Sequence, residues 1–329
     1  MSSDNRNMAL GAVKQTAAEF TDDECLTMAA AIAYYTAFSL PPLLVLIVTV
    51  AGWIWSADAV TSEVEAQVSD VIGEGGWAQV RQMMEAAGEQ GSGPAAIVGI
   101  IALLFGATGV MVQLQASLNK AWQVQPDPDQ GGVKTFAIKR LLSLAMIVAV
   151  AFLLLVSLVM TTLLRAMAGY ITSWLPQGVS TWVPLAIDSA VSLVVFTLLF
   201  GAMFKWLPDA NVRWRDTWIG AGVTALLFMV GKFALGMYFG MTDTGQYGAA
   251  ASFVLLLLWA YYSAAIFLFG AEFTQVWARQ HGRQIVPEDG AVRVVRETRR
   301  MDNSANETGA GRHAPADASK NPGAVSRQG

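Results

Sequence analysis

Thiols and imidazoles are scarce in this sequence. Cys25 is the only cysteine, and His281 and His313 are the only histidines among 329 residues. One cysteine cannot form an intrachain disulfide, and clusters of thiolate or histidine metal ligands are excluded. Walker loops, strand-associated dinucleotide fingerprints and HExxH or zinc-type spacings are also missing. We therefore expect no metal, no cofactor and no catalysis of the soluble type.

Charge is also low, at 14% of residues against roughly a quarter in ordinary soluble domains. In its place the chain has 54% hydrophobic residues and a mean hydropathy of +0.44. The apolar residues come in long blocks that charged residues separate. A hydrocarbon core about 30 Å thick needs roughly 20 helical residues, which these blocks supply. The composition therefore predicts a membrane protein.

We expect an all-α, polytopic membrane protein with six transmembrane helices, because lipid offers no partner for unpaired backbone groups and alternating strand patterns are absent. The predicted domain of residues 25–279 contains spans at about 27–55, 95–119, 141–165, 182–206, 217–239 and 246–277.

The basic residues give an orientation. Of the 21 Lys and Arg residues, 18 precede the first span, lie between spans two and three or four and five, or follow the sixth. Cytoplasmic loops carry such an excess, so both termini are predicted to be cytoplasmic. Tryptophans at the proposed span ends fit interfacial anchoring.

Three segments lie outside the predicted spans. Residues 1–24 form a cytoplasmic leader in which Leu10, Val13, Ala17 and Phe20 recur at helical spacing, which predicts either an interfacial helix or a frayed polar leader. The first outer loop repeats valines at helical spacing, so we expect short amphipathic helices there. Residues 280–329 are predicted to form a basic, largely disordered cytoplasmic tail.

Asp188 and Lys232 are charged residues inside predicted spans, each roughly 10 Å below the outer end of its helix. A charge at that depth is costly unless it is paired or hydrated, so one hypothesis is a buried ion pair. Gly236 and Gly240 follow Lys232 at helical spacing as a GxxxG packing motif, which points Lys232 into the bundle. The alternative is that Lys232 snorkels to the headgroups.

Glu272 lies in the inner half of the sixth span, with Tyr261 eleven residues before it. Gln115 and Asn119 lie at a similar predicted depth in the second span. These side chains could form a polar cluster that binds an ion or relays a proton. A carboxylate that only closes the bundle through hydrogen bonds is the alternative.

Pro41 and Pro42 predict a kink or break in the first span, because they remove two backbone donors. Broken helices often line transporter binding sites, although they also serve as simple shape devices. In the tail, four arginines are expected to be either solvated or in contact with anionic lipid: Arg293, Arg296, Arg299 and Arg300. Small-residue stripes allow a homodimer.

Several strings occur together: AAAIAYYTAFSLPPLLVL, QASLNKAW, RWRDTWIGAGVTALLFMVGKFALGMY and YGAAASFVLLLLWAYYSAAIFLFGAEF. They resemble the YihY/virulence factor BrkB family, formerly labelled the ribonuclease BN family, over roughly residues 18–279. The resemblance implies a six-helix, multi-pass protein of the bacterial cytoplasmic (inner) membrane. Positions that match recurrent features of the family are Tyr34, Asn119, Trp122, Pro208, Lys232, Tyr247, Gly248, Gly270 and Glu272.

The resemblance leaves the function open. The ribonuclease label is rejected here, because a histidine-rich metal site lacks its ligands, and no nucleic-acid partner is expected. The leading interpretation is a transporter or permease for an ion, a small solute or a lipid. The alternative is a structural or assembly protein of the cell envelope. An intramembrane enzyme comes last, because no acid, base and nucleophile converge.

Overall fold

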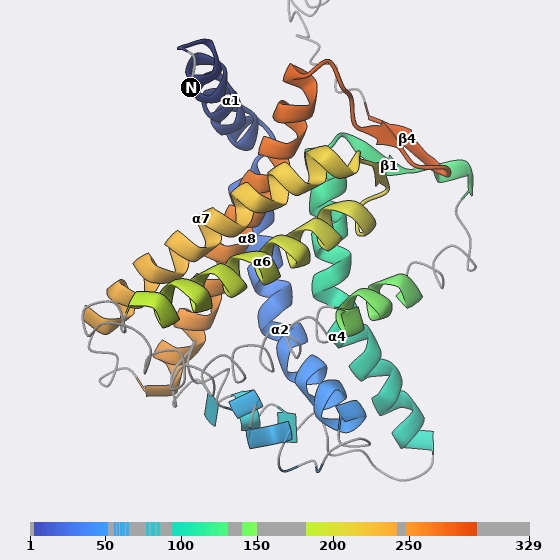
Figure 1. Cartoon of the computed structure of the whole chain (residues 1–329). Coiled ribbons are helices and arrows are strands. Elements are labelled where there is room, and N and C mark those ends of the chain that lie inside the picture. Colours follow the sequence, from blue (N-terminus) through green and yellow to red (C-terminus); the bar gives the residue numbers. More distant parts are fainter. Residues whose placement is uncertain are drawn as a thin grey trace, which may run out of the picture. The chain divides into compact units, whose positions relative to one another are not determined.

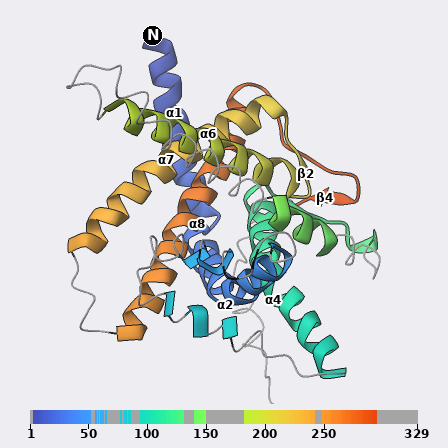
Figure 2. The same ribbon diagram turned by 60° about the horizontal axis from the view of Figure 1, so that its bottom comes forward.

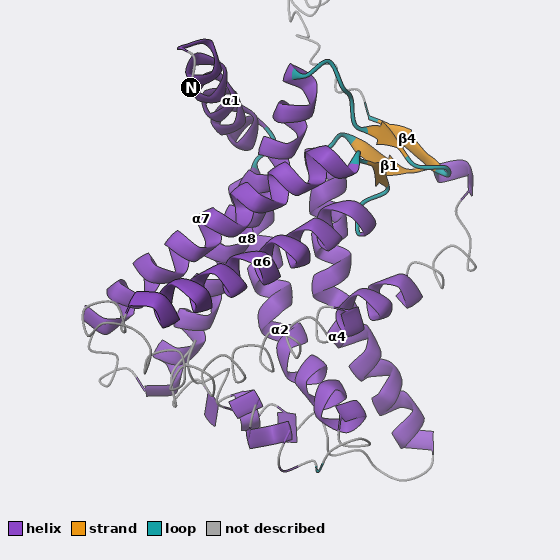
Figure 3. Ribbon diagram, in the orientation of Figure 1, coloured by secondary structure: helices purple, strands orange, loops and turns teal. Residues whose placement is uncertain are grey.

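Helices make up most of the computed structural model of this chain (Figure 3). The residues it describes are 3–51, 56, 58, 60–62, 64–65, 77–78, 80–82, 84–85, 94–130, 140–149, 182–241 and 248–294. They belong to one compact unit, Met1–Val294. Within these residues, four helices are long and apolar enough to cross a membrane; their apolar stretches are Cys25–Val45, Ser189–Trp206, Trp214–Leu235 and Phe253–Gln280. The expectation of a helical membrane protein is therefore confirmed.

Helix α1 (Ser3–Asp22) leads by a tight turn into α2 (Cys25–Ala51). Glu24 in that turn has a φ of 57°, a left-handed conformation that separates the two helices. The leader therefore forms a helix. It packs along α8 (Gly248–Gln280), where Thr16 is buried and Ala12 clusters with Phe273.

Helix α2 packs against both α4 (Pro94–Ala121) and α8, and Figure 1 shows α2 and α4 side by side. Of the kink or break predicted at Pro41 and Pro42, the break is wrong, because α2 continues through both prolines, and the kink stays a prediction. A Cβ on Gly106 of α4 would lie 3.0 Å from Pro42 Cγ, so this glycine makes room for the proline ring. The Ser39 hydroxyl accepts a hydrogen bond of 3.2 Å from the N–H of Val110 in α4. The neighbouring helix thus supports the proline turn.

Helices α6 (Trp182–Trp206) and α7 (Trp214–Met241) run side by side, and α7 also packs on α8 (Figure 1). The α7–α8 contact is reciprocal. A Cβ on Gly220 would lie 1.8 Å from Thr274 Oγ1, and a Cβ on Gly270 would lie 1.8 Å from Thr224 Oγ1. Each helix therefore places a threonine on a glycine of the other, which brings the two backbones close together.

A small cap of extended segments closes one end of the helices. Strand β1 (Val124–Pro126) pairs with β4 (Ala291–Arg293), and β2 (Ala210–Asn211) pairs with β3 (Val286–Pro287), both antiparallel. Figure 2 shows β2 and β4 at the same end. The chain after α8 thus joins the loop after α4 to the loop between α6 and α7. The predicted tail is therefore ordered up to Val294, because its backbone groups are paired in these two sheets.

The core lies where the helices meet below this cap, and its largest fully buried side chains include Trp122, Phe204 and Leu268. The span expected at 141–165 is described only as a helix over Arg140–Ala149. In the first outer loop, the described residues between 58 and 85 are helical apart from gaps, and Trp77 and Val80 pack with Leu44 of α2. The six-span count and the paired loop helices stay predictions, as does the tail beyond residue 294, which lies outside the described residues.

Candidate intramembrane polar site

Glu272 is fully buried in α8, within a helix stretch that is long and apolar enough to span a membrane. The thiol of Cys25 donates a hydrogen bond to Glu272 Oε1, with a sulfur–oxygen distance of 3.6 Å. Among the residues that the structure describes, Glu272 Oε2 has no hydrogen-bond partner. A buried carboxylate oxygen without a partner is rare, because its desolvation is not compensated. This carboxylate is the centre of the candidate site.

The start of α2 forms one wall of this site. Cys25 is the first residue of α2 and is itself fully buried. Trp122, which follows α4, makes a second contact with this part of α8: its indole N–H donates a 3.0 Å hydrogen bond to the carbonyl of Ala271, next to Glu272 in sequence. The start of α2 and the end of α4 thus both contact the stretch of α8 that contains Glu272.

Three charged residues act on the buried Glu272 carboxylate. Asp23 and Glu19 act on it with like charge, and Arg279 acts with opposite charge. Arg279 is already engaged, because its guanidinium binds both carboxylate oxygens of Glu19 at 2.8 and 3.1 Å. Glu19 and Arg279 therefore largely offset each other, and the buried Glu272 carboxylate is the group that can bind a cation or a proton.

The predicted partners of Glu272 bind another acid instead. Asn119 donates a 2.8 Å hydrogen bond to Asp209 Oδ2 and accepts one of 2.8 Å from the Asp209 N–H. Gln115 donates to Asp209 Oδ1 at 3.3 Å. These bonds attach the end of α4 to the loop between α6 and α7. Tyr261 lies partly buried against the core, and no described hydrogen bond joins it to Glu272.

Lys232 is exposed in α7, so the inward orientation expected from the GxxxG motif is wrong. The neighbouring Gly231 is the buried residue, because a Cβ there would lie 2.6 Å from the ring of Tyr262 in α8. Successive helical residues point about 100° apart, which turns Lys232 away from this contact. The side chain of Asp188 lies outside the described residues, so its pairing with Lys232 stays a prediction. The same holds for the packing of Gly236 and Gly240, which lie in α7.

Two polar connections have no counterpart in the sequence predictions. Arg283 binds Asp216 at the start of α7 through two hydrogen bonds of 2.6 and 3.0 Å, with Asp216 buried. The second connection joins Asp209 to Asn119 and Gln115. Asp209 and Asp216 lie in a loop and at a helix start, where several other charged residues are close in sequence. The sequence alone therefore does not single them out, and only their partners in the structure do. Of the four tail arginines, Arg293 lies in β4 and donates to Gln284, and the other three lie outside the described residues.

The sequence model of a known family covers nearly the whole of this unit. The model described as Virulence factor BrkB matches residues 16–293. This chain belongs to the virulence factor BrkB family. The match includes both sides of the Cys25–Glu272 contact and the cap up to Arg293.

Curated relatives of this BrkB-family chain are named as membrane proteins. A UPF0761 membrane protein of Alkalilimnicola ehrlichii is 30% identical over 80% of this chain and 57% of its own length. Another from Alcanivorax borkumensis is 25% identical over 84% of this chain and 63% of its own length. The chain thus spans less than two thirds of these relatives. A Bacillus subtilis protein named as ribonuclease-like is 23% identical over 84% of this chain and 98% of its own length. No solved structure matches.

The BrkB-family chain is thus an integral membrane protein with a buried polar site where α2 contacts α8. Over the described ranges, no group of three or more His, Cys, Asp or Glu residues could hold a metal ion. What the site offers chemically is one carboxylate with a free oxygen and one thiol. Such a pair can take up or release a proton, or bind a single cation.

Proposed function

We propose that this protein is a transporter or permease for an ion, a small solute or a lipid, in which Glu272 binds the coupling cation or proton. The observation that carries the proposal is the fully buried Glu272 carboxylate with one oxygen lacking a partner among the described residues. Ionisable groups inside membrane spans are costly, and they often mark ion pathways.

The surroundings of Glu272 support this role. Glu272 contacts Cys25, the first residue of α2, and so lies close to the turn between α1 and α2. Two ion pairs lie around this turn: Glu19 with Arg279, and Glu24 with Lys120 at 3.1 Å. In the proposal, a movement of this turn lets the carboxylate exchange its cation.

The test is flux through purified protein in proteoliposomes under imposed pH, sodium and potassium gradients. We expect the wild type to carry flux and Glu272→Gln to abolish it. Glu288→Gln is the control, because it removes a carboxylate that is exposed rather than buried and that lies outside the turn between α1 and α2. Equal flux in folded Glu272→Gln and wild type would contradict the role of Glu272.

A structural or assembly role in the cell envelope is the second candidate. The observation that favours it is that Asp209, Asp216 and Arg283 use their polar groups to fix the cap to the helices. In this case no gradient would drive flux, and the loss of the protein would alter envelope integrity instead. Neither candidate is an enzyme, and with only two histidines in the chain we do not propose ribonuclease activity.

The finer topology belongs to the same proposal: six spans, both termini cytoplasmic, in the bacterial inner membrane. The one-sided distribution of Lys and Arg supports it. Reporter fusions after residue 329 and within residues 56–94 test it, with cytoplasmic and outer signals expected respectively. The proposal also includes contact of the tail arginines with anionic lipid: Arg293, Arg296, Arg299 and Arg300. Lipid retention by a chain truncated before these arginines tests that contact. A homodimer is a further part of the proposal, and the mass of the detergent-solubilised protein tests it.

A further inference from the structure

Three exposed tryptophans form a continuous aromatic surface where α6 ends and α7 begins. The rings of Trp206 and Trp214 meet edge to face with centroids 5.7 Å apart, and those of Trp214 and Trp218 stack at 6.0 Å. Each remains about half exposed, at 52%, 46% and 42%. We call these residues, together with Lys205, Arg213 and Arg215, the Trp–Arg patch.

Packing beneath the rings holds this surface in place. A Cβ on Gly201 of α6 would lie 3.6 Å from Trp218 Cζ3, so the Trp218 ring lies against a helix surface that has no side chain in its way. The connecting loop turns its apolar residues inward, with Leu207 and Val212 buried. Each ring is therefore held by packing on its inner side, while its outer side stays exposed.

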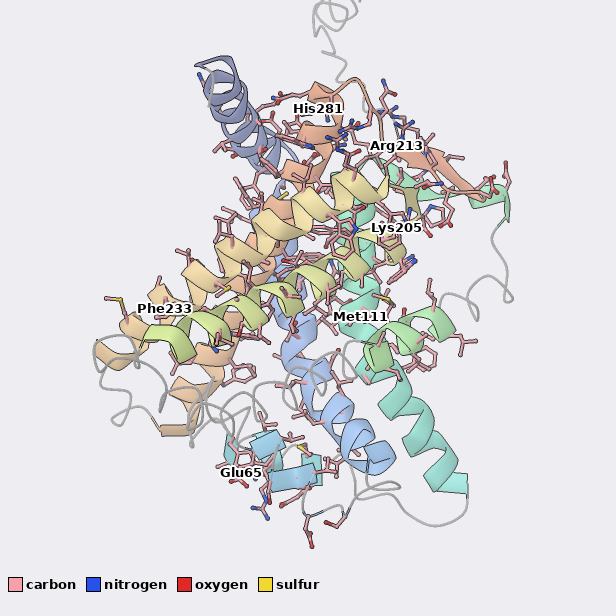
Figure 4. All side chains as sticks on the ribbon, in the orientation of Figure 1. Glu65, Met111, Lys205, Arg213, Phe233 and His281 are labelled. Carbon is pink, nitrogen blue, oxygen red and sulfur yellow. The ribbon has the colours of Figure 1, made fainter. Side chains whose placement is uncertain are left out.

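The patch carries positive charge that the described protein does not neutralise. Lys205 Nζ donates a 2.6 Å hydrogen bond to the Val212 carbonyl and lies 5.6 Å from the centroid of the Trp214 ring. Arg213 and Arg215 are exposed, and neither makes an ion pair within the described part of the chain. Figure 4 shows Lys205 and Arg213 toward the end of the helices that also holds His281, away from Phe233.

Two of the four neighbouring acids are bound within the protein, and the other two form no ion pair with the patch. Asp216 is bound by Arg283, and Asp209 is bound by Asn119 and Gln115. Glu288 and Asp289 lie in the exposed turn between β3 and β4, and neither forms an ion pair with the patch arginines over the described ranges. The exposed face of the patch therefore joins three aromatic rings to three cations.

We propose that the Trp–Arg patch binds the headgroup of an anionic phospholipid in the leaflet that this end of α6 and α7 reaches. Candidate spans end at Trp206 and begin at Trp214, which places the patch at the level of the headgroups. Tryptophan is favoured at that level, arginine binds phosphate through two parallel hydrogen bonds, and basic residues near a membrane attract anionic lipid. The inference is independent of transport and applies equally to an assembly protein.

Native mass spectrometry of the full-length chain in detergent tests the proposal, with dioleoyl phosphatidylglycerol and dioleoyl phosphatidylcholine as the probes. We expect the wild type to retain phosphatidylglycerol preferentially. The Arg213→Gln/Arg215→Gln variant should lose roughly tenfold or more in phosphatidylglycerol affinity, and its phosphatidylcholine binding should not change. The matched control is Lys14→Gln/Arg81→Gln, which removes two exposed cations outside the patch and should retain the lipid.

Equal loss of phosphatidylglycerol from both double variants, or equal binding of both lipids by the wild type, would overturn the proposal. A measurement on the unaltered chain covers the case in which the patch variant does not fold. Raising the salt concentration should weaken the binding of phosphatidylglycerol to the wild type and leave phosphatidylcholine binding unchanged, because screening acts only on the charged headgroup. Phosphatidylglycerol binding that does not change with the salt concentration would also overturn the proposal.

Discussion

Cys25 Sγ and Glu272 Oε1 lie 3.6 Å apart, although the two residues are separated by 247 positions in the sequence. The contact joins the first residue of α2 to the fully buried carboxylate of α8. It is the one hydrogen bond that the Glu272 carboxylate accepts among the described residues. The only thiol of the chain is therefore part of the surroundings of this carboxylate.

Cys25→Ala should lower the free energy of unfolding by about 1–2 kcal/mol, because it leaves Glu272 Oε1 buried without its donor. Cys25→Ser keeps an O–H donor at the position and should lose less. Unfolding by titration of mixed micelles with a denaturing detergent measures both variants. Equal losses would mean that Cys25 contributes packing volume alone.

Gly220→Ala should lower the free energy of unfolding by about 1–3 kcal/mol, because the new Cβ would lie 1.8 Å from Thr274 Oγ1. Gly222→Ala is the matched control. It lies two residues further along the same helix with nothing within 4 Å of the new Cβ, and it should be neutral or stabilising by up to about 1 kcal/mol. The same micelle titration compares the two, and a Gly220→Ala variant as stable as Gly222→Ala would exclude the close α7–α8 contact.

Arg283→Met should cost about 3–5 kcal/mol of stability, because it leaves the buried Asp216 carboxylate without its cation. Adding Asp216→Asn should recover a large part of that loss. Lys120→Met, which breaks the exposed pair with Glu24, should cost at most about 1 kcal/mol. Thermal unfolding of the wild type and the three variants measures these differences, and no recovery in the double variant would count against a direct Asp216–Arg283 interaction.

Asn119→Ala should cost about 2–3 kcal/mol, because Asp209 would lose a donor to its carboxylate and an acceptor for its N–H. Gln113→Ala removes a side chain from the same helix that bonds only Ser117, at 3.3 Å, and should cost at most about 1 kcal/mol. Limited proteolysis of the loop between α6 and α7 should accelerate in Asn119→Ala alone. Unchanged proteolysis would mean that Asn119 does not hold this loop.

The hydrophobic runs predict the membrane helices well, because length and apolar character are local properties of the sequence. The orientation of Lys232 could not be predicted in this way. Gly236 and Gly240 suggested one face of α7, whereas the contact with Tyr262 uses Gly231, about 100° away from Lys232. The choice among several glycines depends on the partner helix, which a single sequence does not reveal.

Pro41 and Pro42 failed as a break signal for a similar reason. The helix continues where Gly106 of α4 leaves space for the Pro42 ring. At the candidate site, the sequence identified Glu272 because a charge in an apolar run is conspicuous. It assigned Asn119 to Glu272 by depth alone, and could not show that Asp209 of a distant loop is the partner.

The reciprocal contact between α7 and α8 restricts how the protein can change shape. In the observed register each threonine meets a glycine: Thr224 meets Gly270, and Thr274 meets Gly220. A slide by one helical turn in one direction would bring Thr224 against Thr274, and a slide in the other would leave two glycines facing each other across a void. We therefore expect α7 and α8 to move together as one rigid body. A transport cycle that exposes Glu272 to one side of the membrane and then to the other would therefore need α1, α2 and α4 to move relative to α7 and α8.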